Sequence, residues 1–201
     1  MNKRTFIVYC DGSATADSFT EKFNGGYGIV IIDKKYDGKS PIPCYSYKSG
    51  LIRDTTNNRM ELTAFIKSIE IINAIIKKDN VLPTEVSIIV SSDSSYLVKG
   101  NNEWLANWIR SGWKTASKKP VENLDLWKMI AEINKNFNVT YRWVRAHQKL
   151  STSITEQQLY LSEEPTKEFD VYFNNFVDIA ASSREVLSEE EKLTRTDLNF
   201  S

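Results

Sequence analysis

Short runs of β-branched and aromatic residues recur along the chain and predict five β-strands. These runs are residues 5–10, 27–32, 42–52, 86–92 and 139–144. Turn signals separate the first three runs, including Asn24-Gly25-Gly26, which is typical of a hairpin. Short connections between consecutive strands indicate an antiparallel meander.

Apolar residues spaced three and four apart predict helices between and after these strands. The longest stripe covers 62–76 and follows the capping residues 55–58, a second covers 123–137, and a third begins at Phe173. A right-handed crossover through the long helix would place the strand at 86–92 parallel to the first strand. The pattern therefore predicts the α/β class, with a mixed five-stranded sheet (three antiparallel strands, then parallel ones) flanked by helices.

Composition narrows the class of protein further. The chain has 201 residues, which indicates one domain, and its 26 Lys and Arg balance 26 Asp and Glu, so a nucleic-acid surface would have to be a local patch. Cys10 and Cys44 lie in predicted strands and are expected as buried free thiols, although their spacing does not exclude a bridge. No run has the apolar length of a signal peptide or a membrane span, so we expect a cytoplasmic protein without a membrane partner.

Four acidic residues stand at or near the ends of predicted elements. Asp11 directly follows the first strand and Asp93 the fourth, so parallel pairing would bring both to one edge of the sheet. Glu61 lies in the first turns of the long helix, and Asp178 follows Asn174 by four residues on the last helix. Three of them have an ordinary alternative, since Asp11 could cap a turn, Glu61 could face the helix dipole and Asp93 could be a helix N-cap.

Three Asp and one Glu without a Cys or His cluster favour a hard cation, Mg²⁺ or Mn²⁺. Carboxylates crowded together without metal raise one another's pKa values. Two ions about 3.5–4 Å apart would relieve that repulsion and can hold the attacking and leaving oxygens of a phosphodiester. His147 is the only histidine and follows the last predicted strand, so a catalytic role competes with a structural or merely exposed one.

Residues 99–119 differ in character from the rest of the chain. Five Lys and Arg side chains stand there against a single acid, Glu103, and three tryptophans are interleaved with them. Tryptophans four and five residues apart can simply pack two helices together. Beside so many cations they also suit a surface that touches sugar and phosphate, so we expect the nucleic-acid handle here.

Taken together, these motifs closely resemble type 1 ribonuclease H, the enzyme that cuts the RNA strand of RNA–DNA hybrids. The resemblance rests on Y-C-D-G-S (9–13), G-G-Y-G (25–28), T-T-N-N-R-M-E-L (55–62), S-D-S-S-Y (92–96), the Trp- and Lys-rich string 104–123, D-L-W (125–127), W-V-R-A-H (143–147) and N-x-x-x-D (174–178). These strings keep the family's order from residue 4 to about 184. The resemblance implies the ribonuclease H-like fold and a hybrid substrate.

The resemblance also implies roles for particular residues. Asp11, Glu61, Asp93 and Asp178 match the metal-binding catalytic carboxylates, and His147 matches a histidine that assists water positioning or product release. The implied cofactor is two Mg²⁺ ions, with Mn²⁺ able to substitute, and the implied products carry 3′-hydroxyl and 5′-phosphate ends. The expected substrate-binding residues are Gly12, Ser13, Asn57, Asn58, Ser95, Trp104, Trp108, Trp113, Lys114, Lys118, Lys119 and Asn174.

This chain departs from the family pattern at several places. Ile109 and Glu122 stand where well-studied bacterial members are basic, and Ser95 replaces a frequent Gln. The segment after His147 is longer and more acidic than the family's short glycine-containing loop, and it could be a lid or a partly helical insertion. The predicted boundaries are a catalytic domain at 1–184, an insertion at about 148–171, and a charged tail at 185–201 with a short helix at 188–191.

Three functions remain open on the sequence alone. The leading one is a monomeric, metal-dependent endoribonuclease that acts on RNA–DNA hybrids. The second is a catalytically silent hybrid-binding module, which the presence of all four acids disfavours. The third is a DNA nuclease of the same fold, such as a resolvase or a transposase-type enzyme, which the T-T-N-N-R-M-E-L string and the Trp-Lys handle disfavour.

Overall fold

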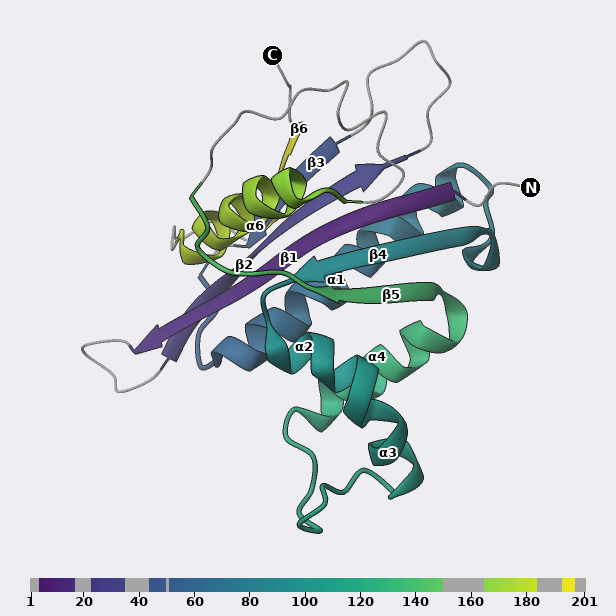
Figure 1. The fold of residues 1–201 in the computed structure, drawn as a ribbon, viewed down its shortest axis with the longest axis vertical. Helices are drawn as coiled ribbons and strands as arrows, with labels where there is room; N and C mark the ends of the chain where they lie inside the picture. Colours follow the sequence, from purple (N-terminus) through teal and green to yellow (C-terminus); the bar gives the residue numbers. More distant parts are fainter. Residues whose placement is uncertain are drawn as a thin grey trace.

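Strand β1 (Arg4–Ala16) is the central element of the fold, because it is hydrogen-bonded to a neighbouring strand on each side. In this computed structural model it pairs antiparallel with β2 (Phe23–Asp33) and parallel with β4 (Val86–Ser92). β3 (Cys44–Ser49) pairs antiparallel with β2, and β5 (Asn138–Trp143) pairs parallel with β4. The order β5-β4-β1-β2-β3 confirms the predicted mixed five-stranded sheet (Figure 1).

A sixth strand extends the sheet at its antiparallel end. β6 (Leu193–Asp197) pairs antiparallel with β3, within the segment that the sequence predicted as a charged tail. The run L-T-R-T-D contains a single strongly apolar residue, so it carries no pattern typical of a strand. The predicted helix at 188–191 lies outside the residues that the structure describes.

The structure describes residues 4–16, 23–34, 44–49, 51–149, 165–183 and 193–197. Within these ranges, no helix has the length and apolar character needed to cross a membrane.

Helices cover the two faces of the sheet (Figure 1). On one face α1 (Asn57–Lys78) packs on β1 and β2, and α4 (Leu124–Asn136) packs on α1. On the other face lies α6 (Lys167–Ser182), which contacts β1 and β2. Successive side chains of β1 point to opposite faces of the sheet. Phe6 and Val8 are therefore buried with α1, while Ile7 and Tyr9 are buried with α6.

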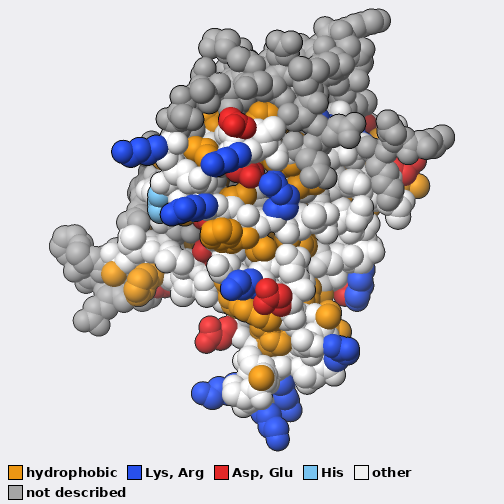
Figure 2. All heavy atoms as spheres, in the orientation of Figure 1, with side chains coloured by type: hydrophobic (Ala, Val, Ile, Leu, Met, Phe, Trp, Pro, Cys, Tyr) orange, Lys and Arg blue, Asp and Glu red, His pale blue; other side chains and the backbone are white. Residues whose placement is uncertain are grey.

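A smaller helical region projects from this body below β5 in Figures 1 and 2. It consists of α2 (Ser95–Lys99), a π-helical turn (Gly100–Trp104), α3 (Leu105–Arg110) and the loop 111–123. A short 3₁₀ turn (Pro83–Glu85), which is not part of this region, directly precedes β4. Lys and Arg side chains gather at the tip of the projecting region in Figure 2, so we call residues 95–123 the basic protrusion.

The hairpin turn predicted at Asn24-Gly25-Gly26 is wrong, and Asp11 does not cap a turn, because β1 continues past it. Residues 24–26 lie inside β2, paired with residues 13–15 of β1, and β1 itself continues through Gly12 and Ser13 to Ala16. A Cβ atom at Gly25 would lie 2.2 Å from the Ser13 carbonyl oxygen, so this glycine serves close packing of two strands and not a turn.

Other predictions fall partly within the described residues. Cys10 is a buried free thiol, as predicted, and Cys44 lies in β3. α6 begins at Lys167, so the last residues of the predicted insertion at 148–171 are helical, while 150–164 lie outside the description. The predicted domain boundaries stay predictions.

Candidate active site

Asp11 stands on β1 at the place where the neighbouring strand β4 ends. The parallel pairing of β1 with β4 stops at Tyr9 and Ser91, so Asp11 lies just beyond the last paired residue, and Asp93 follows β4 directly. The register of the two strands therefore brings both acids to one edge of the sheet, as the sequence predicted. Asp11 itself is buried, with 7 % of its surface exposed.

Gly12 brings the long helix against this edge. A Cβ atom at this position would lie 2.2 Å from the Glu61 backbone nitrogen and from the Met60 carbonyl carbon, which no side chain can occupy. The backbones of β1 and α1 therefore touch immediately after Asp11. This contact places Glu61, in the second turn of α1, beside the carboxylate of the strand.

Ser94 connects Glu61 to the start of α2. Its hydroxyl donates a hydrogen bond to Glu61 Oε2 over 2.5 Å and accepts one from the backbone N–H of Leu97 over 3.0 Å. Ser94 is thus the N-cap of α2, and the alternative in which Asp93 is only a helix cap is wrong. Sequence reasoning missed this role for Ser94, although a serine directly before a helix is a recognisable capping signal.

Asp93 is held from two directions. The side-chain amide of Asn174 donates to Asp93 Oδ2 over 3.0 Å, and the indole Nε1–H of Trp143 donates to the Asp93 backbone carbonyl over 3.0 Å. Asn174 was expected to contact substrate, but only 1 % of its surface is exposed and its described contact is with Asp93. Its Oδ1 atom is buried and accepts no hydrogen bond from the described residues.

Asp178 lies one helical turn after Asn174 on α6, on the side of the helix that faces His147. His147 Nδ1 lies 3.2 Å from Asp178 Oδ2, so the structure brings the single histidine to the acids as the sequence suggested. His147 has a positive φ of 50°, which is uncommon for a residue with a side chain, and its side chain is 77 % exposed. The adjacent backbone is tied to α6, because Asn175 Nδ2 donates to the Gln148 carbonyl over 2.8 Å.

The carboxylates act on one another electrostatically. Burial and the nearby charge of Asp93 raise the pKa of Asp11 to about 8, with Asp178 and Glu61 adding to the shift and the Gly12 N–H opposing it. Burial also raises the pKa of Glu61, which the Ser94 hydroxyl partly offsets and Asp93 reinforces. Four acids from β1, α1, the end of β4 and α6 therefore share one electrostatic site.

The chemistry of this donor set fits a hard divalent cation, since every ligand is a carboxylate oxygen. As the side chains stand, no three His, Cys, Asp or Glu residues in the described part of the chain are arranged to hold one ion together. Mg²⁺ commonly takes only one or two carboxylates and completes its octahedron with waters and substrate phosphate oxygens. Burial and repulsion from the neighbouring acids raise the pKa of Asp11, and a bound cation would relieve that repulsion.

Other expected substrate-binding residues surround these acids. Asn57 Oδ1 accepts a hydrogen bond from the Ala14 backbone N–H, which ties the start of α1 to β1 two residues beyond Gly12. Asn58 and Ser13 are half-buried, and Ser95 is exposed at the first turn of α2. These side chains flank the carboxylates on the side where the strands end.

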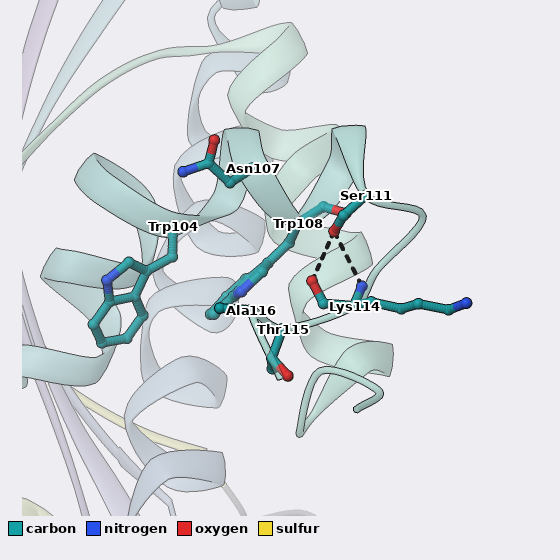
Figure 3. A pocket seen from close by; sticks show the side chains of 7 residues that line it. All are labelled: Trp104, Asn107, Trp108, Ser111, Lys114, Thr115 and Ala116. Atoms are coloured by element: carbon teal, nitrogen blue, oxygen red, sulfur yellow. Dashed lines mark hydrogen bonds between the residues drawn. The ribbon is translucent and has the colours of Figure 1, made fainter. Parts of the chain in front are cut away.

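The basic protrusion contains a pocket of about 330 Å³ (Figure 3). Trp104 and Trp108 form two of its walls, and the Lys114 side chain extends away from their rings toward solvent. Both indoles belong to a chain of ring contacts that includes Trp104–Trp108 at 5.6 Å and Trp108–Trp127 at 5.2 Å. The packing alternative is therefore confirmed for Trp108, which contacts the buried ring of Trp127, while contact of these tryptophans with sugar and phosphate stays a prediction. The pocket is lined by Trp104, Asn107, Trp108, Ser111, Lys114, Thr115 and Ala116.

The loop after the pocket presents the remaining cations. Trp113 is half-buried, its carbonyl accepts from the Val121 N–H over 3.1 Å, and its N–H donates to the Trp108 carbonyl over 2.6 Å. Lys118 and Lys119 are exposed, and Lys and Arg side chains gather at the end of the projecting region in Figure 2. The predicted cluster of tryptophan and lysine thus forms one surface, separate from the four acids.

Comparisons with known proteins agree with this geometry. The family model described as RNase H matches residues 3–157. A ribonuclease H of Ruthia magnifica subsp. Calyptogena magnifica is 39 % identical over 147 residues, which is 73 % of this chain and 85 % of that protein. One from Francisella philomiragia subsp. philomiragia is 38 % identical over 145 residues, which is 72 % of this chain and 81 % of that protein.

Solved structures give the same result. The crystal structure of LC9-RNase H1, a type 1 RNase H with the type 2 active-site motif, superposes with a TM-score of 0.62 at 26 % identity, covering 90 % of this chain and 74 % of that one. The solution structure of the PFV RNase H domain superposes with a TM-score of 0.56 at 24 % identity, covering 89 % and 93 %, and shows the shared fold.

The fold and these matches define a hydrolase of the divalent-metal-dependent nuclease class. The chain belongs to the ribonuclease H family, and the predicted resemblance to type 1 ribonuclease H is confirmed. The family match ends at residue 157, before α6, so it includes Asp11, Glu61, Asp93 and His147 but not Asp178. The structure supplies this fourth acid by packing α6 on β1 and β2.

Proposed function

We propose that this chain is an endoribonuclease that hydrolyses the RNA strand of RNA–DNA hybrids with two Mg²⁺ ions and leaves 3′-hydroxyl and 5′-phosphate ends. The family supports cleavage of RNA in hybrids. The observation that supports the rest is the convergence of four carboxylates from four separate elements; burial, together with the charges of the other three acids, raises the pKa of Asp11 to about 8. Asp11 is buried and the other three acids are partly buried, and acids crowded in this way destabilise a protein unless a cation compensates them.

The residues that would hold the metal are Asp11, Glu61, Asp93 and Asp178, and Mn²⁺ would satisfy the same oxygen donors. When bound, a pair of such ions activates the attacking water and stabilises the departing 3′ oxygen. Neighbouring side chains keep these ligands in place. Asn174 orients the Asp93 carboxylate and Ser94 orients that of Glu61. Outer hydrogen bonds of this kind set both the direction and the basicity of metal ligands.

His147 is suited to a proton-transfer role beside these acids. Its Nδ1 faces Asp178, which fixes the ring and favours a proton on that nitrogen. Nε2 then remains to exchange a proton with water near the reacting phosphate. The high exposure of the side chain fits a group that meets bulk solvent as products leave.

The basic protrusion would grip the DNA strand of the hybrid. Lys114, Lys118 and Lys119 are exposed cations for phosphates, and the pocket between Trp104 and Trp108 has apolar walls that suit a sugar or base. Selection of a hybrid over duplex DNA requires contacts to 2′-hydroxyls across a wide minor groove. Polar groups near the carboxylates that could make such contacts are Gly12, Ser13, Asn57, Asn58 and Ser95.

The deciding experiment is cleavage of a hybrid with separately labelled RNA and DNA strands, in Mg²⁺, in Mn²⁺ and in EDTA. We expect metal-dependent cuts confined to the RNA strand, with 5′-phosphate ends, and none with Asp11→Asn, which should still bind the hybrid. Tight binding without cleavage in either metal would instead establish a silent hybrid-binding module. Cleavage of duplex DNA would establish a same-fold DNA nuclease. The cytoplasmic location and the monomeric state stay predictions.

A further inference from the structure

The segment that follows β5 presents a row of large side chains beside the active site. Trp143, Arg145, His147 and Lys149 are exposed, whereas Val144 between the first two is 4 % exposed. This alternation of exposed and buried side chains continues past Trp143, where β5 ends. The backbone is still paired with the end of β4 there, since the Val144 N–H donates to the Ser92 carbonyl over 3.1 Å. We call residues 143–149 the rim segment.

The rim segment is fixed to two of the elements that carry the acids. At its start the indole N–H of Trp143 bonds the backbone of Asp93. Near its end His147 contacts Asp178, and the Gln148 carbonyl accepts from Asn175 on α6. A ligand lying across the carboxylates would therefore meet this segment.

Trp143 has the chemistry of a nucleic-acid contact. With 56 % of its surface exposed, it is among the largest apolar groups that the described structure leaves in water. Its one polar atom is already hydrogen-bonded to Asp93, so what it offers a ligand is the apolar ring. The bases of a hybrid are paired and stacked inside the duplex, so what this ring can pack against is a ribose of the backbone, through burial of apolar surface.

The cations of the rim segment complement this ring. Arg145 and Lys149 make no ion pair with any residue in the described ranges. In Figure 2 several Lys and Arg side chains surround the histidine on this face, next to an apolar patch. A polyanion that approaches four carboxylates is repelled by them, and cations at the border of the site offset that repulsion.

We propose that the rim segment is a second nucleic-acid contact, in which Trp143 packs against a ribose of the RNA strand next to the scissile phosphate while Arg145 and Lys149 bind the phosphates of that strand. The inference rests on the proposed function, because it takes the hybrid as substrate. The RNA strand is the expected occupant, since the rim segment adjoins the carboxylates that act on RNA, whereas the basic protrusion lies elsewhere on the molecule.

Binding of a hybrid in EDTA, followed across a salt series, tests the proposal without cleavage. We expect Trp143→Ala to weaken binding by at least about fivefold, the loss typical of truncating a tryptophan that contacts a ligand. Trp143→Phe keeps an aromatic face but loses the bond to Asp93, and it should stay within about threefold of wild type. An equal loss in both variants would show that the indole acts only through Asp93, and would overturn the packing role.

The cations have a matched control on the far end of α1. Arg145→Ala with Lys149→Ala should lower the slope of log K against log salt by about one to two, since each phosphate contact contributes about 0.7–0.9. Lys77→Ala with Lys78→Ala removes two exposed lysines from the last turn of α1 and should leave the slope unchanged. An unchanged slope in the rim variant would exclude phosphate binding there.

Cross-linking identifies the strand. Thiouridine in the RNA should cross-link to the wild-type protein and lose that product in Trp143→Ala, while thiothymidine in the DNA should be unaffected. A product from the DNA strand alone that needs Trp143 would overturn the assignment to RNA. Failure of the proposed function would appear instead in the cleavage assay, as a wild-type protein that binds but does not cleave, and the binding and cross-linking results do not depend on that outcome.

Discussion

The amide of Asn174 donates its hydrogen bond to the carboxylate of Asp93, and this bond joins α6 to the end of β4 across the active site. Asn174→Ala should therefore lower the rate of hybrid cleavage about 10- to 100-fold, the usual effect of losing such a support, and raise the Mg²⁺ concentration needed for half-maximal rate. Metal titrations of cleavage measure both quantities. Asn136→Ala, which removes an exposed amide from α4, is the control, and an equal effect there would contradict a specific role.

The pKa of Asp11 predicts how the metal-free protein responds to pH. In the folded chain this pKa is raised from 3.8 to about 8, so between these values the folded state keeps a proton that the unfolded state has released. Stability in EDTA should therefore fall as pH rises from 4 to 8 and level off above that. At pH 8 Asp11→Asn should be more stable than wild type by at least about 1.4 kcal/mol, the equivalent of one pKa unit.

Urea unfolding at pH 5, 6.5 and 8 measures this difference. The gain from Asp11→Asn should be small at pH 5 and largest at pH 8, because burial and the neighbouring acids destabilise the ionised form of Asp11 and not its protonated form. A gain that does not change with pH would show that the substitution acts through packing. Added Mg²⁺ should reduce the gain, since the ion compensates the carboxylate in wild type.

Gly12→Ala should destabilise the fold through its contact with α1. The new methyl group would overlap the backbone of Glu61 and Met60, and overpacking of this kind costs about 1–3 kcal/mol. Gly112→Ala is a useful comparison, because Gly112 has a φ of 66° but no atom within 4 Å of the added carbon, so only backbone strain of about 1 kcal/mol is expected. Denaturant midpoints compare the two. A smaller loss at Gly12 than at Gly112 would contradict the close approach.

A buried polar network fixes the first turn of α6 to the sheet. Asp170 accepts from the Tyr9 hydroxyl over 3.0 Å and from Arg142 over 3.1 Å, and Arg142 also donates to Ser91 over 3.0 Å. Asp170→Ala should cost about 1.5–3 kcal/mol, as expected for hydrogen bonds to a charged group, and Tyr9→Phe about 1 kcal/mol. In the double variant the costs should fall short of additive, because both remove the same contact. Thermal and urea unfolding measure them.

The two lysines at the tip of the basic protrusion should act through phosphates alone. Lys118→Ala with Lys119→Ala should weaken hybrid binding and lower its salt slope by about one to two. Cleavage at saturating substrate should be unchanged, because the loop that carries both lysines projects from the body of the protein, away from the strands β1 and β4 (Figure 1). An unchanged salt slope would place the handle elsewhere on the molecule.

Much of this fold follows from patterns within short windows of sequence. The strand runs at 86–92 and 139–144 and the stripe of α1 are set by burial of one face or both, so they are visible as periodicity. The acids Asp11 and Asp93 could be found because each comes at the end of a paired run on one of two parallel strands. Their meeting follows from topology, which the order of elements already indicates.

The remaining features depend on contacts between distant segments. The extension of β1 through Gly12 is set by the backbone of α1, and the position of residues 24–26 within β2 is set by β1. Asn174 and Trp143 both donate hydrogen bonds to Asp93. No spacing in the sequence distinguishes an amide that binds substrate from one that binds a carboxylate. β6 is held by pairing with β3, and its residues carry no signal of their own.

The parallel pairing of β1 with β4 has a consequence for how the chain folds. Arg4 pairs with Val86, and β2, β3 and α1 all lie between these two residues in the sequence, so the pairing is long-range and raises the contact order of the protein. The local hairpins and α1 can form early, but none of them alone contains two of the four acids, so none brings two acids together. Nuclease activity during refolding should consequently return with the slow formation of native tertiary structure, and a partly folded chain would be catalytically harmless to cellular RNA.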